Sequence, residues 1–467
     1  MLLKLLTKNF QYFCNMKFIN SNDTICAIAT GGSISAVAVI RVSGLNAIEI
    51  VNKIFSKNIS TAKSHTIHFG TVRDQNKIID EVLVSIFKNH RSYTGEESVE
   101  ISCHGSVFIQ QRIIHLLIKN GCRSAEPGEF TLRAFRNNKI DLSQAESVAD
   151  LIASDSVSTH VTAMKQLRGG ISKKLSVLRT ELIDFASLIE LELDFSEEDV
   201  EFANKNKLKQ LLWKIKNEIE DLINSFEIGN AIKNGIPIVI LGAPNVGKST
   251  LLNCLVEDEK AIVSNIPGTT RDLIEDEIFL KGIKFRIVDT AGLRKTTDVI
   301  EKLGIEKSIK KAKKSSIIIY IIDPTQNINV QLEGLEKIKE STESYIVTVV
   351  NKSDLNTKIN TKLKDLAFIS AIKNKGIDNL KNTIVNRINS KNKFSDKTTI
   401  TNIRHVNELK LTLDEIDIII SGVENNITND FLSSNIRQSL YHLGVITGEV
   451  TNDKILENIF GKFCIGK

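Results

Sequence analysis

The sequence predicts three structural regions: a small α+β domain, an all-helical domain, and an α/β domain with a parallel sheet that is inserted into the helical one. Three observations lead to this prediction. Short β-branched runs dominate up to about residue 140, a helical period follows in a stretch without proline between Pro127 and Pro237, and from residue 235 short apolar runs alternate with helix-like sequence. A chain of 467 residues is long enough for about three domains.

The composition is that of a globular protein, with 42% hydrophobic and 25% charged residues. The net charge of +5 permits a nucleic-acid partner without requiring one. No apolar run approaches the ~18 residues of a membrane span. The six cysteines are scattered without a Cys-x-x-Cys pair, which favours free thiols in a reducing compartment.

The first 22 residues have three Lys and no Arg, unlike an Arg-rich mitochondrial presequence. We interpret residues 1–22 as an unstructured extension, or as a start assigned too early, with Met16 as the first residue. The preferred location of the protein is the cytoplasm of a bacterium, and the mitochondrion is the less favoured alternative.

Residues 23–140 form the α+β domain of this interpretation. β-branched runs separated by glycine or polar residues predict strands at 25–29, 36–42, 66–72, 81–87 and 99–102. A helix is predicted at 107–120, ending at Gly121.

Residues 141–234 form the first part of the helical domain. Apolar residues at three- and four-residue spacing predict helices beginning near Leu142 and covering 175–193 and 208–226. The second part, residues 391–467, contains predicted helices at 402–421 and 433–446 and ends in the letters CIGK. We expect the helices before residue 235 and after about residue 398 to pack together.

Residues 235–390 form the inserted α/β domain. Short apolar runs at 236–241, 284–288, 316–322, 345–350 and 367–369 predict buried parallel strands. The Lys- and Asn-rich stretch 386–397 is interpreted as a linker.

A phosphate-binding loop follows the first of these strands. Residues 242–249 read GAPNVGKS and precede a predicted helix, which is the context that the P-loop motif requires. The backbone amides of such a loop surround phosphates, Lys248 can reach the β- and γ-phosphates, and the Ser249 hydroxyl can bind Mg²⁺.

Three further motifs stand at strand ends and point to guanine nucleotides. Residues 289–292 read DTAG, and residues 268–272 read GTTRD, in which Thr270 suits a switch contact to Mg²⁺. Residues 351–354 read NKSD, and Asp354 can accept two hydrogen bonds from guanine that adenine cannot donate. Ser370 and Ala371 suit a backbone contact to the guanine oxygen. Together these motifs predict GTP binding.

The sequence leaves the hydrolytic groups open. Leu293 stands where related enzymes carry a water-orienting Gln, and no arginine finger is identifiable within the chain. Asn245 could ligate a monovalent cation between the phosphates. The water could be oriented by Asp298, Glu301 or Glu306, and spacing does not choose among them.

With these motifs in place, the chain from residue 23 to 467 resembles the MnmE (TrmE) family of tRNA modification GTPases. The segments that carry the resemblance are 92–96 (SYTGE), 127–135 (PGEFTLRAF), 142–152, 268–272, 289–294 and 464–467 (CIGK). The family's Pro- and Gly-rich loop is replaced by residues 30–35, TGGSIS, so its folate contacts are not carried over to this loop.

The resemblance implies an N-terminal domain that dimerises and binds 5-formyl- or 5,10-methylene-tetrahydrofolate, and two G domains that meet in a K⁺-dependent way. It also implies a homodimer that works with an FAD-dependent, MnmG-like partner on tRNA. The reaction would add an aminomethyl or carboxymethylaminomethyl group at C5 of the wobble uridine, with ammonium or glycine as the amine donor.

The resemblance also assigns site residues. It places K⁺ at Asn245, Ser264, Ile266 and Thr269, Mg²⁺ at Ser249 and Thr270, and folate at Arg41, Glu100, Lys139 and Lys467. Glu301 matches the family's catalytic Glu, and Cys464 matches the C-terminal Cys associated with tRNA modification. Lys248 and Asp289 complete the predicted catalytic residues. The predicted GTP contacts are Asn245, Val246, Gly247, Lys248, Ser249, Thr250, Ser264, Asn265, Ile266, Pro267, Gly268, Thr269, Thr270, Asp289, Thr290, Ala291, Gly292, Asn351, Lys352, Asp354, Ser370 and Ala371.

Two other functions are compatible with parts of this sequence. A K⁺-type GTPase acting as a ribosome-assembly switch would need neither the N-terminal segments nor Cys464. A structural protein with a vestigial G domain is disfavoured because Lys248, Asp289, Asn351 and Asp354 are all present.

Overall fold

The computed structural model describes residues 23–88, 90–194, 205–260, 277–288, 308–355, 366–391, 398–425 and 427–466. The predicted site residues 264–270, 289–292, Glu301 and Lys467 lie outside this part of the chain, as do the alternatives Asp298 and Glu306. The chain divides into two compact units, residues 1–149 with 443–467, and residues 150–442.

The first unit contains, in its described part, a six-stranded sheet in the order β3-β4-β5-β2-β1-β6. The pairs are antiparallel except β1 with β6. Its elements are β1 (Ile25–Ile28), β2 (Ser35–Ser43), α2 (Ala47–Ile54), β3 (Thr66–Asp74), β4 (Lys77–Phe87), β5 (Ser98–Gly105), α3 (Val107–Lys119), β6 (Arg123–Ser124), α4 (Glu129–Arg136) and α16 (Asp453–Phe460). The boundary between the units falls within helices α5 (Leu142–Ala153) and α15 (Asn429–Thr447).

Alternation along the strands decides which face of this sheet is covered. Ala38, Ile40 and Val42 of β2 are fully buried in one core with apolar residues of α2 and α3. The intervening positions point to the opposite face, where Val37, Ile67, Phe69 and Leu83 remain between 46% and 65% exposed.

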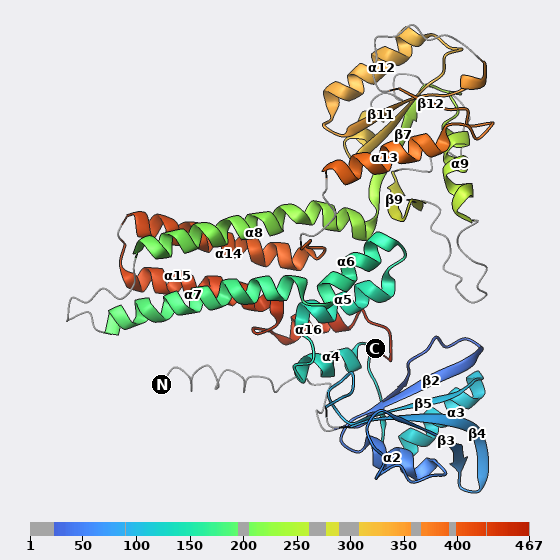
Figure 1. Cartoon of the computed structure of the whole chain (residues 1–467), viewed down its shortest axis with the longest axis vertical. Helices are drawn as coiled ribbons and strands as arrows, with labels where there is room; N and C mark the ends of the chain where they lie inside the picture. Colours follow the sequence, from blue (N-terminus) through green and yellow to red (C-terminus); the bar gives the residue numbers. More distant parts are fainter. Residues whose placement is uncertain are drawn as a thin grey trace. The chain divides into compact units, whose positions relative to one another are not determined.

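The second unit contains the helices α6 (Val157–Leu167), α7 (Gly170–Asp194), α8 (Lys205–Asn234) and α14 (Ile403–Glu424). Helices α8 and α14 lie side by side (Figure 1), and the Lys216–Asp417 ion pair of 2.6 Å joins them. Gly229 of α8 also lies close to the residues just before α14, because a Cβ at this position would be 1.9 Å from the carbonyl oxygen of Ile400. This confirms that helices on the two sides of the α/β segment pack together.

Between α8 and α14 the chain forms the α/β domain. Its sheet has the order β12-β11-β10-β7-β9-β8. The elements are β7 (Ile236–Gly242), α9 (Lys248–Lys260), β8 (Glu277–Leu280), β9 (Ile283–Ile287), β10 (Ile317–Ile322), α12 (Ile328–Ser341), β11 (Tyr345–Val350), the 3₁₀ turn η2 (Ser353–Leu355), β12 (Ala367–Phe368) and α13 (Ile377–Lys391).

The central strand β10 reads IIIYII and is buried on both faces. Ile317, Ile319 and Ile321 enter one core with residues of α9 and α13, whereas Ile318 and Tyr320 enter a second core with residues of α12. Helices therefore cover both faces of the sheet (Figure 1), which explains why this strand is uniformly apolar.

The five predicted strands of this domain are present and pair in parallel, as expected. The elements that were not predicted include helices α2, α4, α6 and α16 and strands β6 and β8. Strand β8 pairs antiparallel with β9. The linker prediction was wrong for residues 386–391, because they continue helix α13, where Ile388 is buried against the sheet. Among the described residues, no helix is both long and apolar enough to cross a bilayer.

Candidate functional site

The loop between β7 and α9 has the backbone of a phosphate-binding loop. Gly242, Asn245 and Gly247 all have positive φ, at 149°, 60° and 99°. A Cβ at Gly242 would lie 2.5 Å from the carbonyl oxygen of Ile321, and one at Gly247 would lie 2.3 Å from Nδ2 of Asn351. Glycine is thus required at both positions by conformation and by space.

Lys248 begins α9 and folds back over this loop. Its ammonium donates to the carbonyl oxygens of Gly242 (2.9 Å) and Ala243 (2.7 Å). Burial, reinforced by the charge of Lys311, lowers the pKa of Lys248. A phosphate placed at the helix N-terminus would favour the charged form, because opposite charge offsets the cost of desolvation. Ser249 and Thr250 follow in the first turn of the same helix.

Asn351 links the phosphate loop to the predicted base-binding loop. Its side chain is 3% exposed, donates from Nδ2 to the carbonyl oxygen of Val246 (2.9 Å), and accepts at Oδ1 from the amide of Ala371 (3.0 Å). Because one buried amide holds both loops, the phosphate and base positions are fixed relative to each other. The structure thereby brings together the predicted Val246, Asn351 and Ala371.

Asp354 lies in the turn η2 beside Ser370 and Lys373. A hydrogen bond from Ser370 lowers the pKa of the Asp354 carboxyl most, and the ammonium of Lys373, at 3.1 Å, lowers it further. The side chain therefore stays ionised at neutral pH, as an acceptor for two N–H groups must be.

Asp323, at the end of β10, was missed by sequence reasoning. Its carboxylate is fully buried, pairs with Lys352 of the NKSD loop at 2.6 Å, and accepts two hydrogen bonds from Thr325. Burial alone would raise the pKa of Asp323, but Lys352 and Thr325 outweigh it and hold the pKa below its usual value. The available signal was an acidic residue directly after an apolar strand.

Two further contacts around the loop were also missed. Gln326 donates to the carbonyl oxygen of Pro244 at 3.1 Å, and the Cys254 thiol lies 3.0 Å from the carbonyl oxygen of Ala371. Neither residue belongs to a motif, so no local signal marked them. Both tie the neighbouring elements to the phosphate and base loops.

The first unit holds a second cluster, around Arg41. The guanidinium pairs with Glu100 at 2.9 Å and lies over the rings of Tyr93 (5.5 Å) and Phe130 (5.6 Å). A cavity of about 180 Å³ adjoins Arg41 and Glu100 and is lined mainly by residues of the 87–98 segment. The predicted residues Arg41 and Glu100 therefore meet.

The other predicted folate residues lie around this cluster in different ways. Lys139 is exposed, donates to the carbonyl oxygen of His90 (3.0 Å), and is not part of the cavity lining. The C-terminal segment reaches Arg41 through the carbonyl oxygen of Gly466 at 3.5 Å. Cys464 is exposed on the same segment.

The P-loop, the NKSD loop and the Ser370–Ala371 segment lie at the carboxyl ends of parallel strands. Together they define a P-loop nucleotide-binding domain of the guanine-specific class. A sequence profile of the MnmE helical domain matches residues 142–464, and one of the GTP-binding protein TrmE N-terminus matches residues 24–139. The chain belongs to the MnmE family of tRNA modification GTPases.

Curated relatives share this assignment over their whole length. The tRNA modification GTPase MnmE of Flavobacterium psychrophilum is 49% identical over 96% of this chain and 99% of its own. The MnmE proteins of Flavobacterium johnsoniae and Bacteroides thetaiotaomicron are each 48% identical over 96% of this chain and 100% of theirs. Among solved structures, the FeoB G domain of Methanococcus jannaschii matches 33% of this chain and 97% of its own at 26% identity, with a TM-score of 0.25.

Proposed function

We propose that this GTPase hydrolyses GTP in a K⁺-dependent way and, with an FAD-dependent partner, modifies C5 of the wobble uridine in bacterial tRNA. The observation that carries the nucleotide part is the Asn351 side chain, which holds the phosphate loop and the base loop at 2.9 Å and 3.0 Å. An ionised Asp354 beside it supplies the acceptor that selects guanine.

The residues of the phosphate loop fit a Mg²⁺–GTP substrate. The loop amides and the N-terminus of α9 would hold the phosphates, Lys248 would exchange its two carbonyl partners for phosphate oxygens, and the Ser249 hydroxyl would bind Mg²⁺ together with Thr270. Asp289 would hold a Mg²⁺-bound water, and the segment 289–292 would contact the γ-phosphate. When bound, K⁺ would supply the positive charge that an arginine finger supplies elsewhere.

Asn245 is the described residue of the proposed K⁺ site. It is exposed, has a φ of 60°, and belongs to the loop that would hold the phosphates. We propose that its side chain shares the ion with Ser264, Ile266 and Thr269, and that Glu301 orients the water. A direct test compares GTP turnover in K⁺ and Na⁺ at equal ionic strength, in wild type and Asn245→Ala. Equal wild-type rates in the two salts would refute the cation site.

Homodimerisation is supported by the open sheet face of the first unit. Val37, Ile67, Phe69 and Leu83 expose apolar side chains there, on the face opposite α2 and α3. Contiguous exposed apolar surface of this kind marks interaction sites. We propose that a second copy of the chain covers it, and that folate binds near Arg41, Glu100, Lys139 and Lys467.

The deciding experiment is nucleoside mass spectrometry of tRNA from cells that lack this gene, with and without complementation. Wild type should restore the C5-modified wobble uridine, whereas Asp289→Ala should not. Folate depletion should reduce the same modification. Unchanged modification in the deletion strain would overturn the proposed reaction and favour a GTPase switch in ribosome assembly.

A further inference from the structure

The hairpin formed by β8 and β9 touches the helical part of the same unit. Its turn, Lys281–Gly282, has positive φ at both residues (51° and 78°), as a tight two-residue hairpin requires. The carbonyl oxygen of Gly282 accepts a hydrogen bond from the amide of Ser158 at 3.3 Å, and a Cβ at Gly282 would lie 3.3 Å from Val157. The hairpin turn thus packs against the first turn of α6.

An ion pair reinforces this contact. Lys284 of β9 is 10% exposed and donates to Asp155 at 2.7 Å, and it also pairs with Glu277 of β8 at 2.8 Å. Asp155 lies in the short connection between α5 and α6, directly before the capping box in which Ser156 and Thr159 fix the start of α6. A displacement of Lys284 would therefore be passed to a rigid helix end rather than absorbed by a loop.

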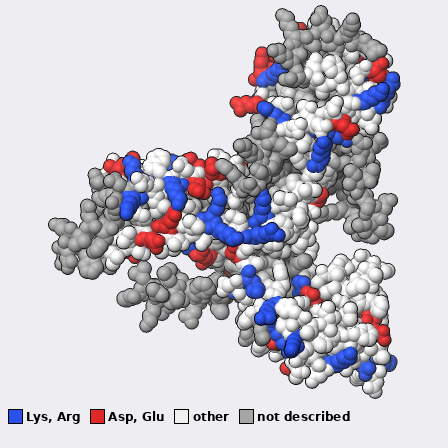
Figure 2. Space-filling view, viewed as in Figure 1, with Lys and Arg blue, Asp and Glu red and all other residues white. Residues whose placement is uncertain are grey.

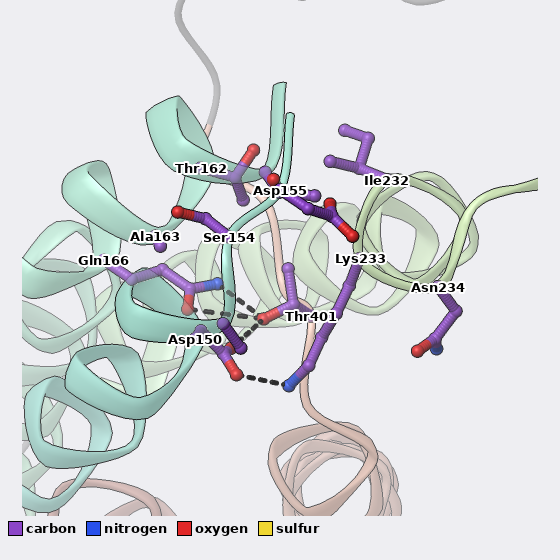
Figure 3. Close-up of a pocket in the computed structure, with 12 residues that line it drawn as sticks. Asp150, Ser154, Asp155, Thr162, Ala163, Gln166, Ile232, Lys233, Asn234 and Thr401 are labelled. Atoms are coloured by element: carbon purple, nitrogen blue, oxygen red, sulfur yellow. Dashed lines mark hydrogen bonds and ion pairs between the residues drawn. The ribbon is translucent and has the colours of Figure 1, made fainter. Parts of the chain in front are cut away.

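The same junction contains a cavity of about 210 Å³, whose lining includes Asp150, Asp155, Gln166 and Lys233. Figure 3 shows Asp150 reaching Lys233 across it, at 2.7 Å, and Gln166 meeting Thr401. Lys233 is in the last turn of α8, just before β7, and Thr401 is where the chain returns from the α/β domain. Residues of both covalent connections of the α/β domain thus line the same cavity as Asp155 and Thr159, beside the place where the hairpin contacts α6.

The hairpin also has a defined place in the sequence. β9 ends two residues before Asp289 of the DTAG motif, and β8 begins five residues after Asp272 of the GTTRD motif. Four paired positions, from Glu277 with Arg286 to Leu280 with Ile283, make the hairpin one mechanical element. A change at either motif can therefore be transmitted along the hairpin to the turn at its other end.

We propose that Asp155 and Lys284 are positioning residues that couple the nucleotide state of the α/β domain to the start of α6. This inference rests on the proposed GTP hydrolysis, because it needs two nucleotide states. In one state the Lys284–Asp155 pair and the Gly282–Ser158 hydrogen bond hold α6 against the hairpin, and in the other state the hairpin turn releases it.

Hydrogen exchange of the full-length chain tests this coupling, because the Ser158 amide itself makes the contact. Exchange in peptides covering residues 156–167 is compared with GDP and with a non-hydrolysable GTP analogue, in Mg²⁺ and K⁺. Wild type should show a difference between the two nucleotides. Asp155→Asn should lose that difference while its GDP affinity is unchanged. Exchanging all three charges, with Asp155→Lys, Glu277→Lys and Lys284→Asp together, should restore it.

The matched control is Glu277→Gln, which removes the pair within the hairpin but leaves the pair to Asp155. It should keep the nucleotide-dependent difference, and its loss in this variant would overturn the coupling. The coupling is also overturned if wild type exchanges identically with both nucleotides, or if Asp155→Asn behaves as wild type. A wild-type chain that does not hydrolyse GTP would instead refute the proposed function, so the two failures are distinguishable.

Discussion

At the residue scale, the nucleotide site depends on buried polar side chains that hold one loop against another. Asn351 is the clearest case, since its amide satisfies a carbonyl in the phosphate loop and an N–H in the base loop. Asp323 holds the NKSD loop through its ion pair with Lys352. The backbone of Lys352 has a positive φ of 58°, a conformation that surrounding contacts must stabilise. Neither the pair nor its burial is visible in the NKSD motif itself.

Replacing Asp323 by Asn should weaken nucleotide binding without changing the catalytic groups. The amide keeps the shape but loses the charge that holds Lys352, so the NKSD loop is less well ordered for guanine. We expect the Kd for a fluorescent GDP analogue to rise by roughly threefold to tenfold, with kcat for GTP little affected. The matched control is Glu336→Gln, which removes an exposed pair with Lys339 and should leave the Kd unchanged. An unchanged Kd in Asp323→Asn would show that the pair does not position the loop.

At the element scale, α4 shows how a short helix can be held by charge. Glu129, in its first turn, is fully buried and accepts hydrogen bonds from Arg123, from Arg133 and from the amide of Glu126, at 2.7 to 3.0 Å. Arg133 extends the network to Glu96 and to the carbonyl oxygen of Asp23. The network therefore joins α4 to β6 and to the 92–98 segment beside the Arg41 cluster.

Glu129→Gln should destabilise the first unit by about 2–4 kcal/mol, because it leaves the buried guanidinium of Arg133 and the partly exposed guanidinium of Arg123 without their shared carboxylate. The exposed Glu49–Lys53 pair supplies the control, since Glu49→Gln should cost about 0.5 kcal/mol or less. Urea titration at pH 7 measures both variants. Equal midpoints for Glu129→Gln and wild type would contradict the assigned role.

The pH dependence of this stability has a defined sign. Burial would raise the pKa of Glu129, but the hydrogen bond from Arg123, the Glu126 amide and the charge of Arg133 outweigh it and lower the pKa below its unfolded value. The stabilisation is therefore present above about pH 4.3, the usual Glu value, and is lost as the pH falls through the folded pKa. The wild-type advantage over Glu129→Gln should shrink as urea titrations are repeated below pH 4.

At the scale of the whole molecule, helices α8 and α14 are far apart in sequence but pack together, one before and one after the inserted α/β domain. On the face in Figure 2, basic and acidic side chains are interspersed over the described surface, in keeping with a net charge of +5 on 467 residues. Cross-helix pairs such as Lys209–Glu424, at 2.6 Å, join α8 to α14. Because residue 229 is a glycine, the return segment (residues 398–402, before α14) can lie directly against α8.

Gly229→Ala should separate α8 from the return segment. The added Cβ would lie 1.9 Å from the carbonyl oxygen of Ile400, which side-chain rotation cannot relieve. We expect a cost of about 2–3 kcal/mol and a Tm lowered by roughly 5 °C or more. Glu227→Ala, on an exposed position of the same helix, is the control and should change stability by about 0.5 kcal/mol or less. Equal Tm values would mean that the segments separate at no cost.

The sequence by itself determined what depends on local order along the chain. The GAPNVGKS and NKSD motifs predicted guanine-nucleotide binding because each follows an apolar strand. Five parallel strands were also predictable from short apolar runs, because a strand that is buried on both faces, as β10 is, must be uniformly apolar. The tertiary structure decided what depends on contacts between distant residues. The Asp323–Lys352, Asp155–Lys284 and Glu129–Arg123 pairs and the antiparallel pairing of β8 with β9 were decided in this way. The physical reason is that an ion pair or an edge strand is stabilised by its partner in space, and one chain's local sequence does not name that partner.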